Sequence, residues 1–242
     1  HYKAFHANML ANEMFLDTTL LRASAVSHAK ALGYLPTSMK ASNALVTVTV
    51  KGVPITQTSL TMTAGSVFTT SVNDTSYQFV TIADHTATSD TGTFQFDDIP
   101  IFEGTRVNYT YTVDSTNLEQ QFLIPSSSVD TGTLVVRVQT SASDTTTETY
   151  KLNTDFTTLD ANSKVYFLQE VEEGRFEVYF GDGVFGYKPI DGNIIILDYV
   201  VTNGALADGA SAFTAASTVG GYSNVTAVSY THLTLPTSRS VE

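Results

Sequence analysis

Few residues of this chain combine the types and spacing that catalysis requires. No HExxH or GxSxG motif occurs, so the sequence offers neither a compact zinc-hydrolase site nor a nucleophile elbow. Of the histidines, we expect His85 to be a solvated loop residue and His28 to bind carbonyl groups at a helix end. The five histidines are scattered over the chain at His1, His6, His28, His85 and His232.

Two groups of carboxylates could in principle act as the acid and base of a glycosidase. They are Asp97-Asp98 and the cluster Glu170, Glu172 and Glu173. Such chemistry requires two carboxyl groups held roughly 5 to 10 Å apart. The acidic cluster surrounds a glycine between two apolar runs, residues 165–171 and 176–180, and this pattern favours an ordinary hairpin turn.

The densest glycine cluster could bind phosphate or calcium, but its surroundings favour a structural turn. A phosphate loop needs a helix after its glycines, whereas a strand pattern follows here. A calcium loop needs carboxylates at alternating positions, which Asp182 and Asp191 alone do not supply. We predict that the cluster forms tight turns that let Phe180 and Phe185 enter the core. The predicted turn residues are Gly181, Asp182, Gly183, Gly186 and Gly192.

Composition excludes several further functions. The 242 residues include 12 Lys plus Arg against 24 Asp plus Glu, a formal charge of −12 that repels nucleic-acid phosphates and anionic lipid heads. The absence of cysteine removes thiolate metal sites and cysteine nucleophiles. We therefore predict a protein that is not an enzyme, with no catalytic or cofactor-binding residues, no metal, and no nucleic-acid, membrane or small-molecule partner.

The elements that must position any site begin with a helical segment over residues 1–42. No Pro or Gly occurs between Tyr2 and Leu32, and apolar residues recur at helical spacing. Asp17-Thr18-Thr19 could cap a second helix, or one kinked helix could run through the segment. Gly33 and Pro36 are typical of its end.

Apolar residues form two stripes on this segment, so it has two faces to bury. Too few helices are present to build a bundle, and we expect partner helices from missing residues or from other chains. The segment is therefore predicted to join an inter-subunit bundle. The predicted interface residues are Phe5, Met9, Leu10, Met14, Leu16, Leu20, Leu21, Ala25 and Leu32.

After Ser42 the pattern changes to period two, as residues 45–50 alternate strictly in the manner of a half-buried strand. The predicted fold class is mainly β with an N-terminal α-helical segment and two small antiparallel β domains, sandwich-like or open. The first domain covers residues 43–113 and the second 114–203. Residues 204–227, rich in Gly, Ala, Ser and Thr, predict a linker or arm. Residues 228–242 resemble one translated frame of a transposase sequencing adapter, and we expect them to be artefactual.

Two segments resemble a known family. Residues 20–38 contain the run Gly-Tyr-Leu-Pro-Thr-Ser over 33–38, and they are similar to the helix-to-loop segment of baseplate wedge proteins of T4-like contractile-tailed phages. Residues 180–186, Phe-Gly-Asp-Gly-Val-Phe-Gly, followed by Pro189, Gly192 and a strand ending at Tyr199, resemble the Phe-Gly-Asp-Gly turn of the baseplate-J-like superfamily.

The resemblance implies a structural component of the virion tail baseplate, made in the host cytoplasm, whose copies join one another and other wedge proteins in a ring around the tail tube. It also implies that this chain is a fragment, with helices before His1 and domains after Ala227. The residues themselves leave two alternatives open. One is a glycan-binding or adhesive β domain that stacks sugars on Tyr and Phe, and the other is a tail-associated hydrolase.

Overall fold

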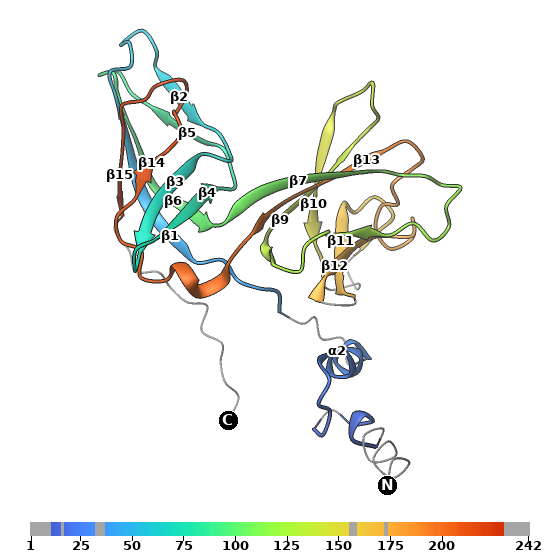
Figure 1. Ribbon diagram of the computed structural model, residues 1–242. Coiled ribbons are helices and arrows are strands. Elements are labelled where there is room, and N and C mark those ends of the chain that lie inside the picture. Colours follow the sequence, from blue (N-terminus) through green and yellow to red (C-terminus); the bar gives the residue numbers. More distant parts are fainter. Residues whose placement is uncertain (1–10, 16, 32–36, 155–158, 172–173, 230–242) are drawn as a thin grey trace. The chain divides into compact units, whose positions relative to one another are not determined.

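The computed structural model describes residues 11–15, 17–31, 37–154, 159–171 and 174–229, and strands dominate it (Figure 1). The predicted mainly-β fold class is confirmed, with only a short helical segment near the N-terminus. The elements are α2 (Arg22–Ala31), β1 (Asn43–Lys51), β2 (Ser59–Met62), β3 (Val67–Val72), β4 (Thr75–Thr81), β5 (His85–Thr88), β6 (Thr93–Glu103), β7 (Thr105–Thr112), β8 (Phe122–Leu123), β9 (Val129–Gln139), β10 (Thr147–Leu152), β11 (Val165–Glu170), β12 (Phe176–Phe180), β13 (Ile194–Val201), the 3-10 turn η2 (Gly204–Ala207), β14 (Thr214–Ala215) and β15 (Val225–Ser229).

The chain divides into two compact units that are interleaved in sequence. Unit 1 comprises residues 1–38, 110–127 and 136–196, and unit 2 comprises residues 39–109, 128–135 and 197–242. The division falls within β7, β9 and β13, each of which supplies residues to both units. The sequence predicted two consecutive domains instead, because hydrophobic periodicity locates strands but does not say which strands pair.

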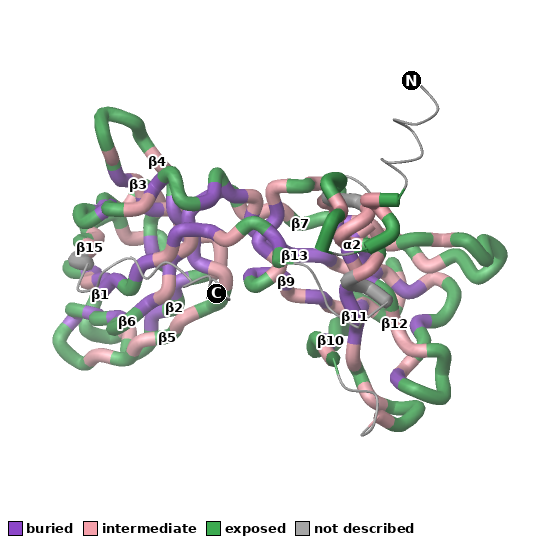
Figure 2. Tube along the Cα trace, turned by 90° about the horizontal axis from the view of Figure 1, so that it is seen from below, coloured by how far each residue is buried: buried purple, intermediate pink, exposed green. Residues whose placement is uncertain are grey.

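Unit 2 contains a six-stranded sheet in the order β14-β3-β4-β6-β1-β15 and a separate two-stranded sheet, β2-β5. The edge strands β14 and β15 contact each other, so the sheet nearly closes on itself. The alternation predicted for β1 holds on one face only: Val46, Val48 and Val50 are fully buried and Leu45 is exposed, but Thr47 is buried and Thr49 half-buried. Figure 2 shows the buried residues gathered along the strands and the exposed residues in the turns.

Residues 204–227, predicted as a linker or arm, are part of this sheet. β14 pairs with β3 and β15 pairs with β1, for example Val50 opposite Val225. Phe213 is buried and packs edge-on against Phe79, with ring centroids 5.0 Å apart. A composition of small residues concealed this, because strand pairing satisfies backbone groups and needs few large side chains.

Unit 1 contains most of a seven-stranded sheet in the order β7-β13-β9-β10-β11-β12-β8. β10 and β11 are parallel, with Lys151 opposite Val165, which corrects the wholly antiparallel prediction. The edge strands again meet: the Tyr111 hydroxyl donates to the Leu123 carbonyl oxygen at 2.6 Å, and its ring packs against Phe122. Both sheets are thus nearly closed and barrel-like, whereas the sequence analysis expected sandwich-like or open sheets.

Aromatic rings fill the interior of unit 1. Phe180 packs edge-on against Phe122 and against Tyr150, with ring centroids 5.8 and 5.5 Å apart, and Tyr150 also contacts Tyr187. Burial raises the pKa of the Tyr150 hydroxyl above its ordinary value and that of Tyr166 to about 12. These hydroxyl groups therefore stay neutral at physiological pH.

Candidate functional site

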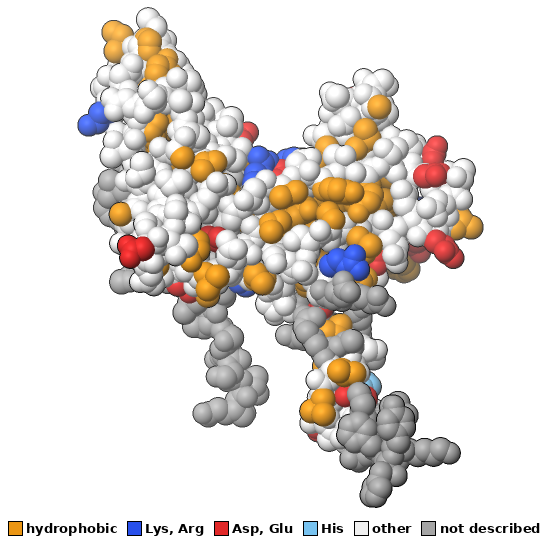
Figure 3. Space-filling view, viewed as in Figure 1, with side chains coloured by type: hydrophobic (Ala, Val, Ile, Leu, Met, Phe, Trp, Pro, Cys, Tyr) orange, Lys and Arg blue, Asp and Glu red, His pale blue; other side chains and the backbone are white. Residues whose placement is uncertain are grey.

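The N-terminal segment exposes apolar side chains, as expected of an unpartnered interface. Met14, Leu20 and Leu21 are 68, 81 and 49% exposed, and Ala25 is half-buried. Phe15 is also exposed, although the predicted stripes omitted it. Figure 3 shows hydrophobic side chains on this segment. The remaining predicted interface residues lie outside the described residues, namely Phe5, Met9, Leu10, Leu16 and Leu32.

A turn stabilised by Glu13 separates two helical pieces of this segment. Residues 11–13 are helical, and α2 begins at Arg22. The Glu13 carboxylate accepts hydrogen bonds from the Thr19 hydroxyl at 2.7 Å and from the Leu20 and Leu21 amides at 3.0 and 3.3 Å. It therefore caps the entry to α2, in the role the sequence assigned to residues 17–19.

This capping changes the acidity of Glu13. Hydrogen bonds from Ser24, Thr19 and the backbone favour the charged carboxylate and lower the pKa of Glu13 to about 2. The Glu13 carbonyl oxygen also lies 2.9 Å from His28 Nε2. His28 thus contacts a carbonyl at a helix end, though that of the preceding helical piece. These contacts hold Met14, Phe15, Leu20 and Leu21 in one exposed turn.

The glycine cluster forms the predicted tight turns in unit 1. Asp182 Oδ1 accepts hydrogen bonds from the Val184 and Phe185 amides at 2.8 and 2.9 Å, which lower the pKa of its carboxyl. Gly183 has φ +91°, a conformation that favours glycine. At Gly181 an added Cβ would lie 2.3 Å from two carbonyl oxygens, so only glycine fits there.

The turn does not bring Phe185 into the core, contrary to the prediction. Phe185 is 52% exposed and Val184 is 63% exposed, whereas Phe180 does join the aromatic interior. The physical reason is that the paired amides of Val184 and Phe185 point inward to Asp182, which leaves their side chains on the outside of the turn. The turn thus offers an apolar tip to solvent.

Of the residues weighed for catalysis, Glu172 and Glu173 lie outside the described residues. The hairpin β11–β12 is antiparallel, with Glu170 opposite Phe176, as the hairpin interpretation requires. Asp97 accepts a hydrogen bond from the side-chain amide of Gln95. His85 lies in strand β5, whereas the sequence predicted a loop there. No group of three His, Asp or Glu side chains able to hold a metal occurs among the residues that the structure describes.

Unit 2 contains buried carboxylates that the sequence analysis missed. Glu103, only 1% exposed, accepts hydrogen bonds from the Thr202 hydroxyl and from both nitrogens of Asn203. Asp130 binds Lys40 Nζ at 2.9 Å and the Ala41 amide at 3.0 Å. Each charge is balanced by donors from distant parts of the chain, so these groups serve the fold. No local sequence signal identifies them.

No family model matches the chain. None of the described helices is long and apolar enough to cross a membrane. The chain is 27% identical over 239 residues to the baseplate wedge protein gp6 of Enterobacteria phage T4, an alignment that covers 91% of this chain and 34% of that protein. The chain therefore spans about a third of the length of the curated relative it matches. This comparison confirms the resemblance inferred from residues 20–38 and 180–186: the chain is similar to a baseplate wedge protein of a contractile-tailed phage.

Proposed function

We propose that this chain is a structural, non-enzymatic part of a phage tail baseplate wedge. In this proposal it contributes to a ring around the tail tube through contacts with copies of itself and with other wedge proteins. Its place is the virion tail, after assembly in the host cytoplasm. The similarity to a T4 baseplate wedge protein supports the class of protein. The observation that supports the assembly role is the exposed apolar turn of the N-terminal segment.

The physical argument concerns four neighbouring apolar side chains. Met14, Phe15, Leu20 and Leu21 are all exposed in the isolated chain, and the Glu13 cap holds the turn that carries them. Burial of apolar surface is worth roughly 25 cal/mol for each Å² removed from water. A partner helix that covers this turn would gain that free energy without first having to order the turn, because the cap already does so. The two predicted stripes also include Phe5, Met9 and Leu10, which lie outside the described residues.

The β units suit the role of rigid spacers. The edge strands of each sheet contact each other, through β14 and β15 in unit 2 and through Tyr111 in unit 1. Nearly closed sheets leave few unpaired strand edges that could aggregate. The charge of −12 keeps free subunits apart before assembly.

The test is to disrupt the turn without disturbing the β units. We expect Met14→Asp and Leu21→Asp each to prevent co-purification of the full chain with the wedge proteins encoded in the same phage genome, because a carboxylate cannot be buried in an apolar helix interface. Circular dichroism of the strands should be unchanged. Ile55→Asp, a matched change at an exposed residue of unit 2, is the control and should co-purify normally.

Undiminished co-purification of both N-terminal variants would refute the assembly role of this segment. Loss of binding by Ile55→Asp as well would show that added charge alone is responsible, and would equally refute it. Electron microscopy of the co-expressed proteins adds a second measurement, since the parent chain should form wedges or rings and the two variants should not.

A further inference from the structure

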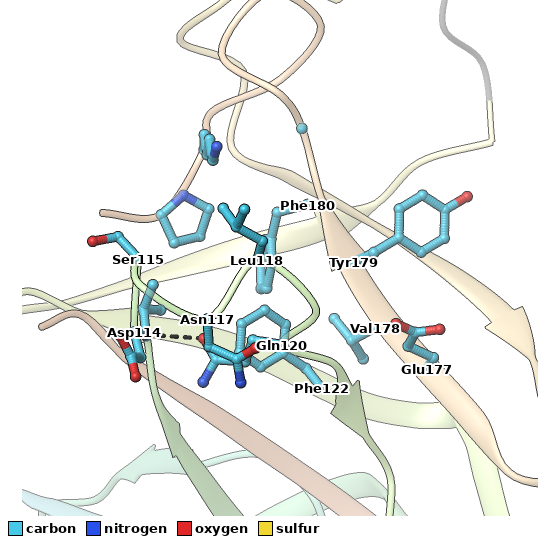
Figure 4. A pocket seen from close by; sticks show the side chains of 14 residues that line it. Asp114, Ser115, Asn117, Leu118, Gln120, Phe122, Glu177, Val178, Tyr179 and Phe180 are labelled. Carbon is cyan, nitrogen blue, oxygen red and sulfur yellow. Dashed lines mark hydrogen bonds between the residues drawn. The ribbon is translucent and has the colours of Figure 1, made fainter. Parts of the chain in front are cut away.

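Unit 1 contains a pocket of about 290 Å³ beside β8 and β12 (Figure 4). Leu118, Phe122, Phe180 and Pro189 supply apolar lining. This volume lies at the small end of the range of about 300 to 1,000 Å³ usual for small-molecule sites, and it is large enough for one large side chain. Leu118 is 95% exposed, and Figure 4 shows it next to Phe180, where it forms part of the mouth of the pocket.

The pocket lies where β8 stops pairing with β12. Among the described residues, β8 pairs with β12 only at Glu177 and Val178, which lie opposite Leu123 and Phe122. β12 continues to Phe180, and Tyr179, Phe180 and Gly181 line the pocket. One edge of the last part of β12 therefore borders the pocket and not a strand.

The neighbouring backbone hydrogen bonds show which way each N–H and C=O group of β12 points. The Ile124 amide donates to the Phe176 carbonyl, so even-numbered residues of β12 direct their backbone groups toward β8. The Val171 amide donates to the Arg175 carbonyl, so odd-numbered residues face β11. By this alternation the N–H and C=O of Phe180 point into the pocket. No described residue forms a hydrogen bond with them on that side.

The side chain of Gln120 keeps this edge open. Its Nε2 donates to the Thr112 carbonyl at 2.7 Å, and its Oε1 accepts from the Asp114 amide at 2.9 Å. Both bonds attach the loop before β8 to the end of β7. Asp114 also accepts two hydrogen bonds from Thr116, which stabilise the same loop. The chain is thus held away from the place where a further residue pair with β12 would form.

We propose that this pocket docks an extended segment of another polypeptide, which continues the position of β8 along β12. The segment pairs with the backbone of Phe180 and places an apolar side chain against Leu118, Phe122 and Phe180. Residues paired across strands direct their side chains to the same face, so the residue opposite Phe180 enters the apolar lining. This is strand addition at a sheet edge, in which backbone bonds give affinity and the side-chain pocket gives specificity.

Charge defines the partner further. Two acidic residues, Asp114 and Glu177, and one basic residue, Lys188, line the pocket. Glu177 is buried, and its carboxylate accepts a hydrogen bond from the Gln169 side chain. The hydrogen bonds from Thr116 lower the pKa of Asp114, so its carboxylate remains charged even in mild acid. A segment with basic residues beside its apolar one complements this lining, whereas a second copy, with a charge of −12, does not. The inference is independent of the role proposed for the N-terminal segment.

The experiment titrates the full ¹⁵N-labelled chain with the acetylated and amidated tripeptide Thr-Lys-Phe, whose C-terminal Phe can lie opposite Phe180 without overlapping Phe122, which pairs with Val178. We expect the amide resonances of Tyr179, Phe180 and Gly181 to shift with saturation. Two matched peptides test the mechanism: Thr-Lys-Ala lacks the apolar side chain, and a peptide N-methylated at Phe lacks the backbone donor. Each should bind about tenfold more weakly or worse, a loss of about 1.4 kcal/mol.

Variants of the chain complete the test. Leu118→Asp places a charge at the mouth of the pocket and should weaken binding of the Phe peptide about tenfold. Leu206→Asp, the same change at an exposed residue of unit 2, should leave binding unchanged. Since both residues are exposed, neither variant should unfold the protein. Absence of shifts at Tyr179–Gly181, equal binding of the N-methylated peptide, or shifts that depend on the concentration of the chain without peptide would each overturn the proposal.

Discussion

Arg106 in β7 binds Asp198 in β13 through two parallel hydrogen bonds. Nε donates to Oδ1 at 2.7 Å, and one terminal nitrogen donates to Oδ2. The other terminal nitrogen donates to the Ala64 carbonyl at 2.9 Å. The Asp198 side chain is only 5% exposed and that of Arg106 is 27% exposed. The pair thus fixes β7, β13 and the turn at residue 64 within unit 2.

Arg106→Leu should lower the free energy of unfolding of unit 2 by about 3 to 5 kcal/mol, because it leaves the buried Asp198 carboxylate without its ionic partner. Arg106→Lys should recover only part of the loss, since an ammonium group cannot reproduce two parallel hydrogen bonds. Urea denaturation followed by circular dichroism measures both. The control is Lys164→Leu, which removes an exposed ion pair with Glu148 and should cost less than about 1 kcal/mol. Equal losses in the two Leu variants would contradict the importance of burial.

Thr202→Val should destabilise unit 2 by about 1 to 3 kcal/mol, although it changes little in shape. Its hydroxyl donates to the buried Glu103 carboxylate at 2.5 Å and accepts from the Gly204 amide at 2.9 Å, so both partners lose a hydrogen bond. Thr226→Val, at an exposed position of β15 in the same unit, is the matched control and should be near neutral. The comparison uses denaturation midpoints. Identical midpoints for the two variants would argue against a structural role for Glu103.

Gly181→Ala should impair unit 1 more than Gly183→Ala does. At Gly181 the added methyl group would meet the backbone oxygens of Phe185 and Gly186 at 2.3 Å, so the turn must open. At Gly183 the nearest atom, Cβ of Lys188, is 3.9 Å away, and only the strain of φ +91° remains, about 1 to 3 kcal/mol. Thermal unfolding and the NMR resonance of the Phe185 amide report both effects. The reverse order of stability would show that the turn is not closed in the manner described.

Acid should release the cap of α2 only well below the ordinary titration range of glutamate. The pKa of Glu13 is lowered from 4.5 to about 2, so its contribution to the folded turn is fully present above pH 4.5 and is lost as the pH falls toward 2. The protection of the Leu20 and Leu21 amides from hydrogen exchange, relative to an unstructured peptide at the same pH, should persist until that range is reached. Glu13→Ala should remove this protection at all pH values. Loss of this protection already at pH 5 in the parent chain would contradict the lowered pKa.

The sequence predicted strand positions well where side chains alternate. In β1, valine alternates with threonine over residues 46–50. This pattern predicted the strand, and it predicted that the valine face is the buried one. The β11–β12 hairpin followed from a glycine between two apolar runs. The turn around Asp182 was predicted for the same reason, because φ above zero and close backbone contacts demand glycine.

Pairing between distant strands was beyond the reach of local patterns. No pattern in the sequence of residues 204–227 predicts that Ala215 lies opposite Phe68 or that Phe213 packs against Phe79. The sequence did not predict the cap formed by Glu13. A capping side chain usually belongs to the residue directly before the helix, whereas Glu13 precedes α2 by a turn and a loop. The exposed Phe185 was misassigned since hydrophobicity alone does not tell which side of a turn a residue takes.

The pairing of β1 with β15 has a consequence for how the protein is made. Val50 in β1 lies opposite Val225 in β15, which is 175 residues later in the chain. During synthesis on the ribosome, β1 therefore emerges long before β15, the strand that completes its sheet. Most of unit 1 is synthesised in between. Closing so long a loop is slow, and unit 1 has time to fold first. A translation product that ends shortly after β13 would leave β1 with a bare edge, which makes premature termination a route to aggregation and hence to loss of assembly-competent subunits.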